Sequence, residues 1–428
     1  MKTVIMAGGK GTRIAEVAAD IPKPMIPICS KPILEYQIEV LKRQDYTDII
    51  IGLGHLGHVI KDYFSDGSSF GVHIEYITEE EPLGTAGALF LMKEMLPDED
   101  FLLLNGDIIF DIDLERFYRY HKEHHAVATL LTHPNSHPYD SGIIVVDENG
   151  QVEQWLHKED ERHWYQNRVN AGLHFLNKEI LNEFATLQKR DLDRDILKPL
   201  IAGGRLFAYD SPEYVKDMGT PDRLIAVEED VRQGMVKAKN LSEMQKAIFL
   251  DRDGTLNVNV GLLTDIEQLE LIPGTAEAVR KINQSGYLAI LITNQPVIAK
   301  GMVSLPELKQ MHDKLETLLG NEGAYLDAIY YCPHHPDRGF EGERIEYKIE
   351  CDCRKPKPGM ILKAAEKYNI SLKESYMIGD TERDILSGKA AGCTTVYVGT
   401  DVSEAADADK VYPDVLCAVQ DILEPHAK

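Results

Sequence analysis

In the stretch Ala247-Ile248-Phe249-Leu250-Asp251-Arg252-Asp253-Gly254-Thr255, four apolar residues lead directly into an acidic loop. A short apolar run bounded by turn residues predicts a strand buried inside a parallel sheet. Such a strand delivers Asp251 to the carboxyl edge of the sheet, where doubly wound folds bind their ligands. Further short apolar runs at 288–293, 375–378 and 394–398 alternate with amphipathic stretches. This alternation is typical of βα units around a mostly parallel sheet.

The same alternation fills the first half of the chain. Apolar runs predict strands, and amphipathic stretches predict the helices between some of them. The predicted strands are 2–7, 48–53, 73–78 and 101–104, and the predicted helices are 32–44 and 85–95. We therefore predict an α/β fold of two domains, each with a mostly parallel, Rossmann-like sheet flanked by helices.

The length of the chain also favours two domains. It has 428 residues, more than one hydrophobic core ordinarily holds. A short polar stretch at 236–246 precedes the strand that leads to Asp251, and domain boundaries fall in segments of this kind. We expect a first domain at 1–235, a linker at 236–246 and a second domain at 247–428.

Composition narrows the choice of partners. The chain carries 46 basic and 70 acidic residues, a formal net charge of −24. This charge repels nucleic acids and acidic membrane surfaces, so neither is expected as a partner. The longest apolar runs have the length of strands and are too short to cross a bilayer. Residues 1–7 lead directly into Gly8, which leaves no room for a signal peptide, and a cytoplasmic location is expected.

The first predicted strand ends in a glycine-rich loop, Gly8-Gly9-Lys10-Gly11-Thr12-Arg13. Its backbone N–H groups are little obstructed, which suits the wrapping of a triphosphate. The loop is not a P-loop, because no Gly-Lys-Ser/Thr follows. It is not a dinucleotide fingerprint either, because Ile14 stands in the place of the third glycine. A tight turn without a ligand is the structural alternative.

Four later motifs accompany this loop. They are Pro22-Lys23-Pro24-Met25, Glu80-Glu81-Pro82-Leu83-Gly84-Thr85-Ala86-Gly87, Asn105-Gly106-Asp107 and Val215-Lys216-Asp217-Met218-Gly219-Thr220-Pro221. With these motifs in this order, residues 1–235 resemble the sugar-1-phosphate nucleotidyltransferases. The resemblance implies that a sugar-1-phosphate oxygen attacks the α-phosphorus of a nucleoside triphosphate and that pyrophosphate leaves. Because anions meet anions in this reaction, charge neutralisation and positioning supply most of the rate.

The resemblance also implies roles for single residues. Arg13 and Lys23 would hold the triphosphate and its developing charge, and Asp107 and Asp217 would hold Mg²⁺. GTP is the favoured nucleotide. His157 stands where the family commonly has an acid. The remaining implied contacts are Gly8, Gly9, Gly11 and Thr12 for phosphate, Leu83, Gly84, Thr85 and Gly87 for base and ribose, and Gly142, Lys158 and Asn170 for the sugar phosphate.

The opening stretch belongs to a second set of motifs. Asp-x-Asp-Gly-Thr at 251–255 is followed in order by Thr293-Asn294, by Arg354-Lys355-Pro356 and by Gly379-Asp380. Residues 247–425 thus resemble the haloacid-dehalogenase-like phosphatases. The resemblance implies that Asp251 attacks phosphorus and forms an aspartyl-phosphate. Asp253 would protonate the leaving oxygen and then activate water.

The same resemblance assigns the remaining contacts of the second domain. Mg²⁺ would be bound by Asp251, the backbone carbonyl of Asp253, and Asp380. For Asp384, a further acid on the same loop, a helix cap is the favoured interpretation. The implied substrate contacts are Thr293, Asn294, Arg354 and Lys355.

Four residues between these motifs have the spacing of a metal site: Cys332, His334, Cys351 and Cys353. Three thiolates and one imidazole make a closed tetrahedral zinc site, which is structural because no position stays open for water. Clustered cysteines in a chain without an export signal favour metal over disulfide. The resemblance selects His334, with His335 as the alternative ligand. Zinc would pin the loop that carries Arg354 and Lys355.

The zinc cluster narrows the resemblance to the branch that holds heptose 1,7-bisphosphate 7-phosphatases and histidinol phosphatases. The run 293–301 is more similar to the heptose enzymes, although Pro296 and Val297 depart from their usual T-N-Q-S-G-I-A-R-G. Together the two resemblances imply a bifunctional enzyme that makes GDP-heptose for surface glycans. Histidinol phosphate, a hexose phosphate, another nucleotide, or a non-catalytic regulatory first half stay open as alternatives. Self-association as a homo-oligomer also stays open.

Overall fold

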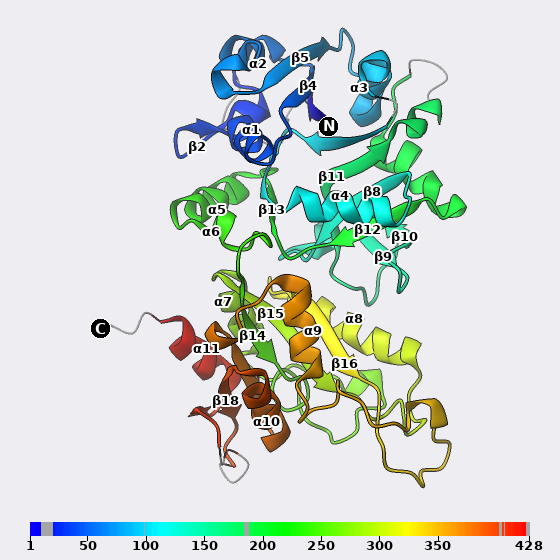
Figure 1. Cartoon of the computed structure of the whole chain (residues 1–428), viewed down its shortest axis with the longest axis vertical. Coiled ribbons are helices and arrows are strands. Elements are labelled where there is room, and N and C mark those ends of the chain that lie inside the picture. Colours follow the sequence, from blue (N-terminus) through cyan, green and yellow to red (C-terminus); the bar gives the residue numbers. More distant parts are fainter. Residues whose placement is uncertain (10–19, 98, 184–187, 402–404, 406, 425–428) are drawn as a thin grey trace. The chain divides into compact units, whose positions relative to one another are not determined.

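The computed structural model describes residues 1–9, 20–97, 99–183, 188–401, 405 and 407–424 (Figure 1). The chain forms two compact units. The first unit holds Met1–His133, Ile144–Leu156 and Val169–Asn240, and the second holds Pro134–Ile143, His157–Arg168 and Leu241–Lys428. Two short segments that precede residue 235 therefore belong to the second unit. No helix that the structure describes is long and apolar enough to cross a membrane.

The first unit is built on a nine-stranded mixed sheet. Its main path runs in the order β10 (Val152–Leu156), β9 (Ile143–Val146), β11 (Val169–Asn177), β6 (Asp100–Asn105), β1 (Lys2–Ala7), β4 (Asp48–Leu53) and β5 (His73–Thr78). β8 (Ala128–His133) pairs with β11 and with β12 (Leu206–Asp210). Strands β6, β1, β4 and β5 are parallel neighbours, whereas β11 runs antiparallel to β6 and β8.

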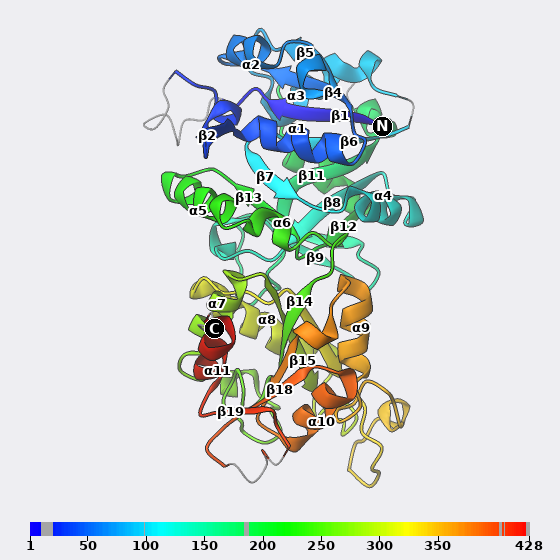
Figure 2. The same ribbon diagram turned by 60° about the vertical axis from the view of Figure 1, so that its left-hand side comes forward.

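Apolar side chains cover both faces of this sheet. Val4 and Ile5 on β1 have no exposed surface and belong to different hydrophobic clusters, because successive side chains of a strand point to opposite faces. Helix α1 (Ile33–Arg43) packs in the cluster of Ile5, and α3 (Gly84–Met92) packs in the cluster of Val4. The two helices therefore lie on opposite faces of the sheet (Figure 2). The unit also contains α2 (Gly57–Phe64), α4 (Leu114–Glu123), α5 (Pro221–Arg232), α6 (Met235–Ala238) and the strand pairs β2 (Pro27–Ile28) with β3 (Lys31–Pro32) and β7 (Ile108–Asp111) with β13 (Tyr214–Asp217).

The second unit is built on a six-stranded sheet in which all neighbours are parallel. The order is β16 (Ala328–Cys332), β15 (Tyr287–Asn294), β14 (Lys246–Leu250), β17 (Tyr376–Gly379), β18 (Thr394–Val398) and β19 (Lys410–Tyr412). The predicted α/β fold is thus confirmed. The sheet of the first unit is mixed, and the sheet of the second is wholly parallel.

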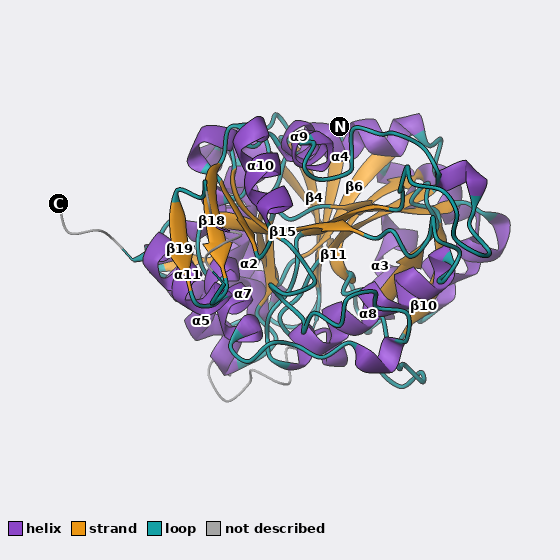
Figure 3. Ribbon diagram, turned by 90° about the horizontal axis from the view of Figure 1, so that it is seen from below, coloured by secondary structure: helices purple, strands orange, loops and turns teal. Residues whose placement is uncertain are grey.

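Helices cover both faces of the second sheet (Figure 3). Leu250 packs with α7 (Thr275–Asn283), α8 (Leu305–Asn321) and α11 (Val415–Leu423), and Phe249 packs on the opposite face with α9 (Gly359–Tyr368). Helix α10 (Glu382–Ala391) follows β17. Because both faces are buried, the strand beginning at Lys246 reads as a continuous apolar run rather than an alternating one.

Buried polar contacts hold the segment 157–168 inside the second unit. Arg168 is 5% exposed, and its guanidinium lies 3.1 Å from the carboxylate of Glu316 on α8, which is 1% exposed. The Tyr165 backbone N–H donates to the Thr317 hydroxyl at 3.0 Å. Removing one partner of a buried ion pair leaves an uncompensated charge, so these contacts fix the segment firmly.

Candidate active sites in the two units

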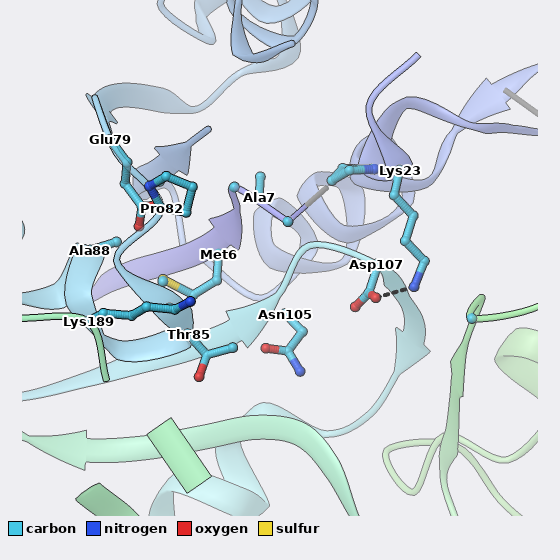
Figure 4. Close-up of a pocket in the computed structure, with 16 residues that line it drawn as sticks. Met6, Ala7, Lys23, Glu79, Pro82, Thr85, Ala88, Asn105, Asp107 and Lys189 are labelled. Atoms are coloured by element: carbon cyan, nitrogen blue, oxygen red, sulfur yellow. Dashed lines mark hydrogen bonds and ion pairs between the residues drawn. The ribbon is translucent and has the colours of Figure 1, made fainter. Parts of the chain in front are cut away.

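A cavity of about 610 Å³ lies at the carboxyl ends of β1 and β6 in the first unit (Figure 4). The last residues of these strands, Ala7 and Asn105, line it. In open α/β sheets this edge is where ligands bind. The lining consists of Met6, Ala7, Gly8, Gly9, Lys23, Pro24, Gly52, Glu79, Pro82, Gly84, Thr85, Ala88, Asn105, Asp107, Lys189 and Gly219.

The structure brings together many of the contacts predicted for the first domain. Those that line the cavity are Gly8, Gly9, Lys23, Gly84, Thr85 and Asp107. Leu83 and Gly87 belong to the same turn and helix start as Gly84. Gly11, Thr12 and Arg13 lie outside the described residues. The predicted sugar contacts are divided, because Asn170 belongs to the first unit and Gly142 and Lys158 belong to the second.

Strand pairing places the segments of Asp107 and Asp217 side by side. In the antiparallel pair β7–β13, Ile108 lies opposite Asp217. The Met218 backbone N–H donates to the Asp107 carbonyl oxygen at 3.2 Å. Two acidic segments that are distant in sequence therefore lie side by side; Asp107 lines the cavity, and so does Gly219, two residues after Asp217. Carboxylate oxygen is a ligand that suits Mg²⁺.

Each of these two carboxylates has a cationic partner. Lys23 forms an ion pair with Asp107. The Arg223 guanidinium donates to both carboxylate oxygens of Asp217, at 2.8 and 2.9 Å. Burial acts to raise the pKa of Asp217, but the charge and hydrogen bonds of Arg223 outweigh it, so this pKa lies below its usual range. Sequence reasoning missed Arg223, which follows the Gly-Thr-Pro run at the start of α5.

A distant segment is locked to the turn that starts α3. Gly84 has φ +78°, and a Cβ there would come within 2.3 Å of the Arg190 carbonyl oxygen. That oxygen accepts from the Ala86 N–H at 3.1 Å, and the Arg190 N–H donates to Leu83 O at 3.0 Å. These bonds place Lys189 at the edge of the cavity. No local motif marked Lys189, because its position depends on a pairing between residues far apart in the chain.

Three carboxylates and one ammonium meet at the carboxyl edge of the second sheet. Oxygen atoms of Asp251, Asp380 and Asp384 all lie within 4.8 Å of one another. Asp251 follows β14, and Asp380 follows its parallel neighbour β17. The Lys355 ammonium lies 2.7 Å from Asp251 Oδ1 and 2.5 Å from Asp384 Oδ1. This geometry is suited to a buried phosphoryl site.

The charge balance of this cluster is incomplete without a further cation. Burial raises the pKa of Asp251, and Asp384 raises it further, although Lys355 opposes both. Burial and Asp384 also raise the pKa of Asp380, to about 6. Asp380 Oδ1 is buried and has no hydrogen-bond partner among the described residues. The three carboxylates therefore fit a hard divalent ion such as Mg²⁺, which would stabilise their charged forms.

The other predicted contacts of the second domain lie around this cluster. Thr293 is buried and accepts from the Gln295 amide at 2.9 Å. The Asn294 side chain accepts from the Lys355 backbone N–H and donates to its carbonyl, both at 3.0 Å. Asp384 accepts from the Thr381 backbone N–H at 3.1 Å, in a capping box at the start of α10. The predicted helix cap is present, and the same side chain also belongs to the carboxylate cluster, which sequence reasoning missed.

The predicted zinc ligands converge on one point. Ligand atoms of Cys332, His334, Cys351 and Cys353 lie within 4.8 Å of one another. The sulfur atoms are 3.2, 3.3 and 3.6 Å apart. Zinc–sulfur bonds of about 2.3 Å in a tetrahedron put sulfur atoms about 3.8 Å apart, so the cluster fits this ion. His335 lies outside the cluster, and its ring packs edge-on against Phe340.

Known proteins resemble both halves of the chain. Residues 2–234 match the nucleotidyl transferase family, and residues 352–424 match a HAD-hydrolase-like family. A D-glycero-beta-D-manno-heptose-1,7-bisphosphate 7-phosphatase of Pasteurella multocida is 44% identical over 180 residues, which cover 42% of this chain and 95% of the relative. A UTP–glucose-1-phosphate uridylyltransferase of Synechocystis is 34% identical over 220 residues, which cover 48% of this chain and 57% of the relative. The crystal structure of HddC from Yersinia pseudotuberculosis has a TM-score of 0.48 and 26% identity, and the match covers 54% of this chain and 99% of that one.

The two family matches, the phosphatase relative and the two sites define a bifunctional α/β enzyme, with a nucleotidyltransferase part followed by a haloacid-dehalogenase-like phosphatase part. The chain belongs to the nucleotidyl transferase family, and its C-terminal part belongs to the family of D-glycero-beta-D-manno-heptose-1,7-bisphosphate 7-phosphatases.

Proposed function

We propose that this enzyme makes a nucleotide-activated heptose in two steps. The second unit removes the 7-phosphate of D-glycero-D-manno-heptose 1,7-bisphosphate. The first unit then transfers GMP from GTP to heptose 1-phosphate and releases pyrophosphate. One observation carries the proposal: a part that is 44% identical to nearly a whole heptose bisphosphate phosphatase shares the chain with a nucleotidyltransferase. The phosphatase leaves one phosphate, at the anomeric carbon, and that is the acceptor that a nucleotidyltransferase needs.

The carboxylate cluster supports phosphate hydrolysis through a covalent intermediate. An oxygen of Asp251 attacks the 7-phosphorus while the bond from phosphorus to the sugar oxygen breaks and Asp253 gives that oxygen a proton. Water then attacks the aspartyl-phosphate, Asp253 takes its proton, and the bond to Asp251 breaks. Lys355 and Thr293 hold phosphoryl oxygens. Asp251, Asp380 and the Asp253 carbonyl would hold Mg²⁺, which would supply the positive charge that lets an anion approach these acids.

The cavity of the first unit supports nucleotidyl transfer by positioning and charge. Gly8, Gly9 and Lys23 line the part of the cavity that would receive the triphosphate. The heptose phosphate oxygen attacks the α-phosphorus in line, and the bond to pyrophosphate breaks. Asp107 and Asp217 would hold Mg²⁺, which neutralises charge on the phosphates.

Two charged side chains support guanine as the base. Glu79 and Lys189 lie at one end of the cavity, and the Lys23–Asp107 pair lies at the other (Figure 4). Guanine offers N1–H and its amino group to a carboxylate, and O6 and N7 to an ammonium. Uracil flanks its N3–H with two carbonyl oxygens, which a carboxylate repels. The charge pair therefore fits guanine better than uracil.

Replacing Glu79 tests the choice of base. A carboxylate offers two acceptor oxygens, whereas an amide offers one acceptor and one donor group. Glu79→Gln should therefore lower kcat/KM for GTP about tenfold or more and reduce the preference of the enzyme for GTP over UTP. Glu80→Gln, an exposed neighbour that does not line the cavity, is the matched control. An unchanged preference in Glu79→Gln would remove the support for guanine.

The decisive experiment is product analysis. The chain is incubated with heptose 1,7-bisphosphate, Mg²⁺ and equal amounts of GTP, UTP, ATP and CTP, and products are identified by mass spectrometry. We expect inorganic phosphate, pyrophosphate and GDP-heptose. Preferential hydrolysis of histidinol phosphate in a parallel reaction would refute the heptose substrate, and UDP-heptose as the main product would refute GTP.

A further inference from the structure

Asp253, the proposed general acid and base, is held by its neighbour in the chain. Arg252 Nη2 lies 3.0 Å from Asp253 Oδ2 and 3.1 Å from Oδ1, and Arg252 Nε lies 3.2 Å from Oδ1. The Arg252 side chain is completely buried, whereas the Asp253 side chain is 23% exposed. An arginine fork on both oxygens fixes the plane of a carboxylate as well as its position.

Two amides complete the support. Asn257 Nδ2 donates to Asp253 Oδ1 at 3.1 Å, and Gln295 Nε2 donates to Oδ2 at 3.0 Å. Gln295 also accepts from Arg252 Nη2 at 3.0 Å through its Oε1 atom. The side chains of Arg252, Asp253 and Gln295 therefore form a closed ring of hydrogen bonds. All these donors are N–H groups that keep their protons, and together they hold the carboxylate in one orientation.

Arg252 is itself fixed from the side away from Asp253. Its Nη1 atom lies 3.4 Å from Nε2 of His312 on α8. Burial and the charge of Arg252 keep the pKa of His312 well below its usual value, so the ring is neutral and accepts this contact. A fully buried guanidinium is costly unless its charge and donors are satisfied. Here the chain keeps such a group, and its only carboxylate partner among the described residues is Asp253.

We propose that Arg252 is a positioning residue for the phosphatase reaction: its buried fork, together with Gln295, aims the Asp253 carboxylate so that one group can serve both proton transfers. This inference rests on the proposed role of Asp253. Without the fork, the Asp253 side chain would rotate about its own χ angles, and proton transfer to the leaving oxygen would lose its geometry.

The test uses substrates whose leaving groups need different help. The sugar alkoxide is a poor leaving group and needs a proton, whereas 4-nitrophenolate leaves without one. We compare kcat/KM, which reports only the steps up to the aspartyl-phosphate, for heptose 1,7-bisphosphate and 4-nitrophenyl phosphate in the full chain. Arg252→Met should lower it about 100-fold for the sugar, within the range of general acid catalysis, and less than fivefold for the aryl phosphate.

Three further variants make the result decisive. Asp253→Asn should show the same selective loss, and Arg252→Lys, which keeps the charge but not the fork, should fall between wild type and Arg252→Met. Arg280→Met, which removes an arginine on α7 that donates to the Glu322 carbonyl, should change kcat/KM for neither substrate. The proposal would be overturned if Arg252→Met lowered kcat/KM equally for both substrates, or if it left kcat/KM for the sugar substrate unchanged.

Two outcomes separate this inference from the proposed function. If Asp253→Asn hydrolyses the sugar phosphate as well as wild type does, the general acid itself is wrong. If Asp253→Asn lowers kcat/KM mainly for the sugar phosphate and Arg252→Met does not, only the positioning role fails. Should Arg252→Met not fold, as judged by its thermal unfolding, Gln295→Leu removes the second support without burying a charge. Gln295→Leu should then lower kcat/KM by a smaller factor than Arg252→Met, again for the sugar substrate more than for the aryl phosphate. An equal fall in kcat/KM for both substrates would overturn the proposal.

Discussion

Single residues near the first cavity show how the carboxylates of the proposed Mg²⁺ site are paired with cations. Asp107 is paired with Lys23, and Asp217 is paired with Arg223. Burial alone would favour the protonated form of Asp217, but the Arg223 guanidinium reverses this preference and lowers its pKa. A carboxylate must be deprotonated to bind Mg²⁺, so we infer that Arg223 keeps Asp217 ready for the metal.

Replacing Arg223 should therefore change how transferase activity depends on pH. In Arg223→Met the pKa of Asp217 rises, so activity should be lost at a higher pH than in wild type as the solution is acidified. The measurement is kcat/KM for GTP between pH 5 and pH 8 at saturating Mg²⁺. Arg232→Met, which removes an exposed ion pair with Glu228 on the same helix, is the control. If the pH at which kcat/KM falls on acidification is the same in Arg223→Met as in wild type, this role of Arg223 is contradicted.

Among the elements, the loop from Cys332 to Lys355 connects the Cys/His cluster to the carboxylate cluster around Asp251. Cys353 is in the cluster, and Lys355, two residues later, contacts Asp251. Arg354 donates to the His334 carbonyl at 3.1 Å between them. A shift of the cluster would therefore displace Lys355 directly.

Removing the metal should slow the phosphatase without affecting the transferase. Cys353→Ser should lose bound zinc and lower phosphatase kcat roughly tenfold or more, a range typical of mutations that disturb a metal site. Zinc content by mass spectrometry and both activities are measured on the same samples. Cys393→Ser, a buried cysteine outside the cluster, should keep both zinc and rate. Full phosphatase activity in a zinc-free protein would contradict the proposed link.

A second element, strand β11, carries a buried histidine. His174 is 1% exposed, and burial lowers its pKa to about 3. Its Nδ1 atom has no hydrogen-bond partner among the described residues. The unfolded chain binds a proton here below about pH 6.5 while the folded chain does not, so acid destabilises the first unit.

This effect should disappear in His174→Leu. At pH 5 the histidine should cost roughly 2 kcal/mol relative to pH 7. The chain has two tryptophans, and Trp164→Phe leaves Trp155, in the first unit, as the fluorescent reporter of urea unfolding. The difference in unfolding free energy between the two pH values should shrink in His174→Leu and persist in His73→Gln, an exposed control on β5. An unchanged difference would exclude His174 as the cause.

At the scale of the whole molecule, two reactions that follow one another chemically are carried by one chain. The cavity with Asp107 lies in the first unit, and the cluster with Asp251 lies in the second. Among the described residues, Lys23, Asp107 and Asp217 belong to the first unit, and Asp251, Asp253 and Lys355 belong to the second. Each reaction should therefore be separable by mutation.

Two single variants should lose one reaction each. Asp107→Ala should release phosphate from heptose 1,7-bisphosphate but form no GDP-heptose, and Asp251→Asn should use heptose 1-phosphate but not the bisphosphate. Mixing the two proteins should restore the complete conversion, because heptose 1-phosphate diffuses between them. Product formation is followed by mass spectrometry. Loss of both reactions in either variant would show that the sites are not independent.

Local sequence was sufficient for much of the fold and for part of the sites. Apolar runs that end in Asp251 and Gly379-Asp380 predicted buried strands of a mostly parallel sheet, and the structure shows β14 and β17 as parallel neighbours. The Cys-x-His and Cys-x-Cys pairs likewise indicated a metal cluster. Such patterns can be recognised locally because hydrophobic period, turn residues and ligand spacing are properties of short stretches of chain.

Only the tertiary structure decided which of these groups have partners and which partners they have. The contact of Lys355 with both Asp251 and Asp384, the fork of Arg252 on Asp253, and the position of Lys189 beside the Gly84 turn were not visible in the sequence. Each depends on the direction of a side chain and on packing between segments that meet only after folding. Sequence thus determined which chemical groups this enzyme carries, and the folded chain determined how those groups are charged, aimed and paired.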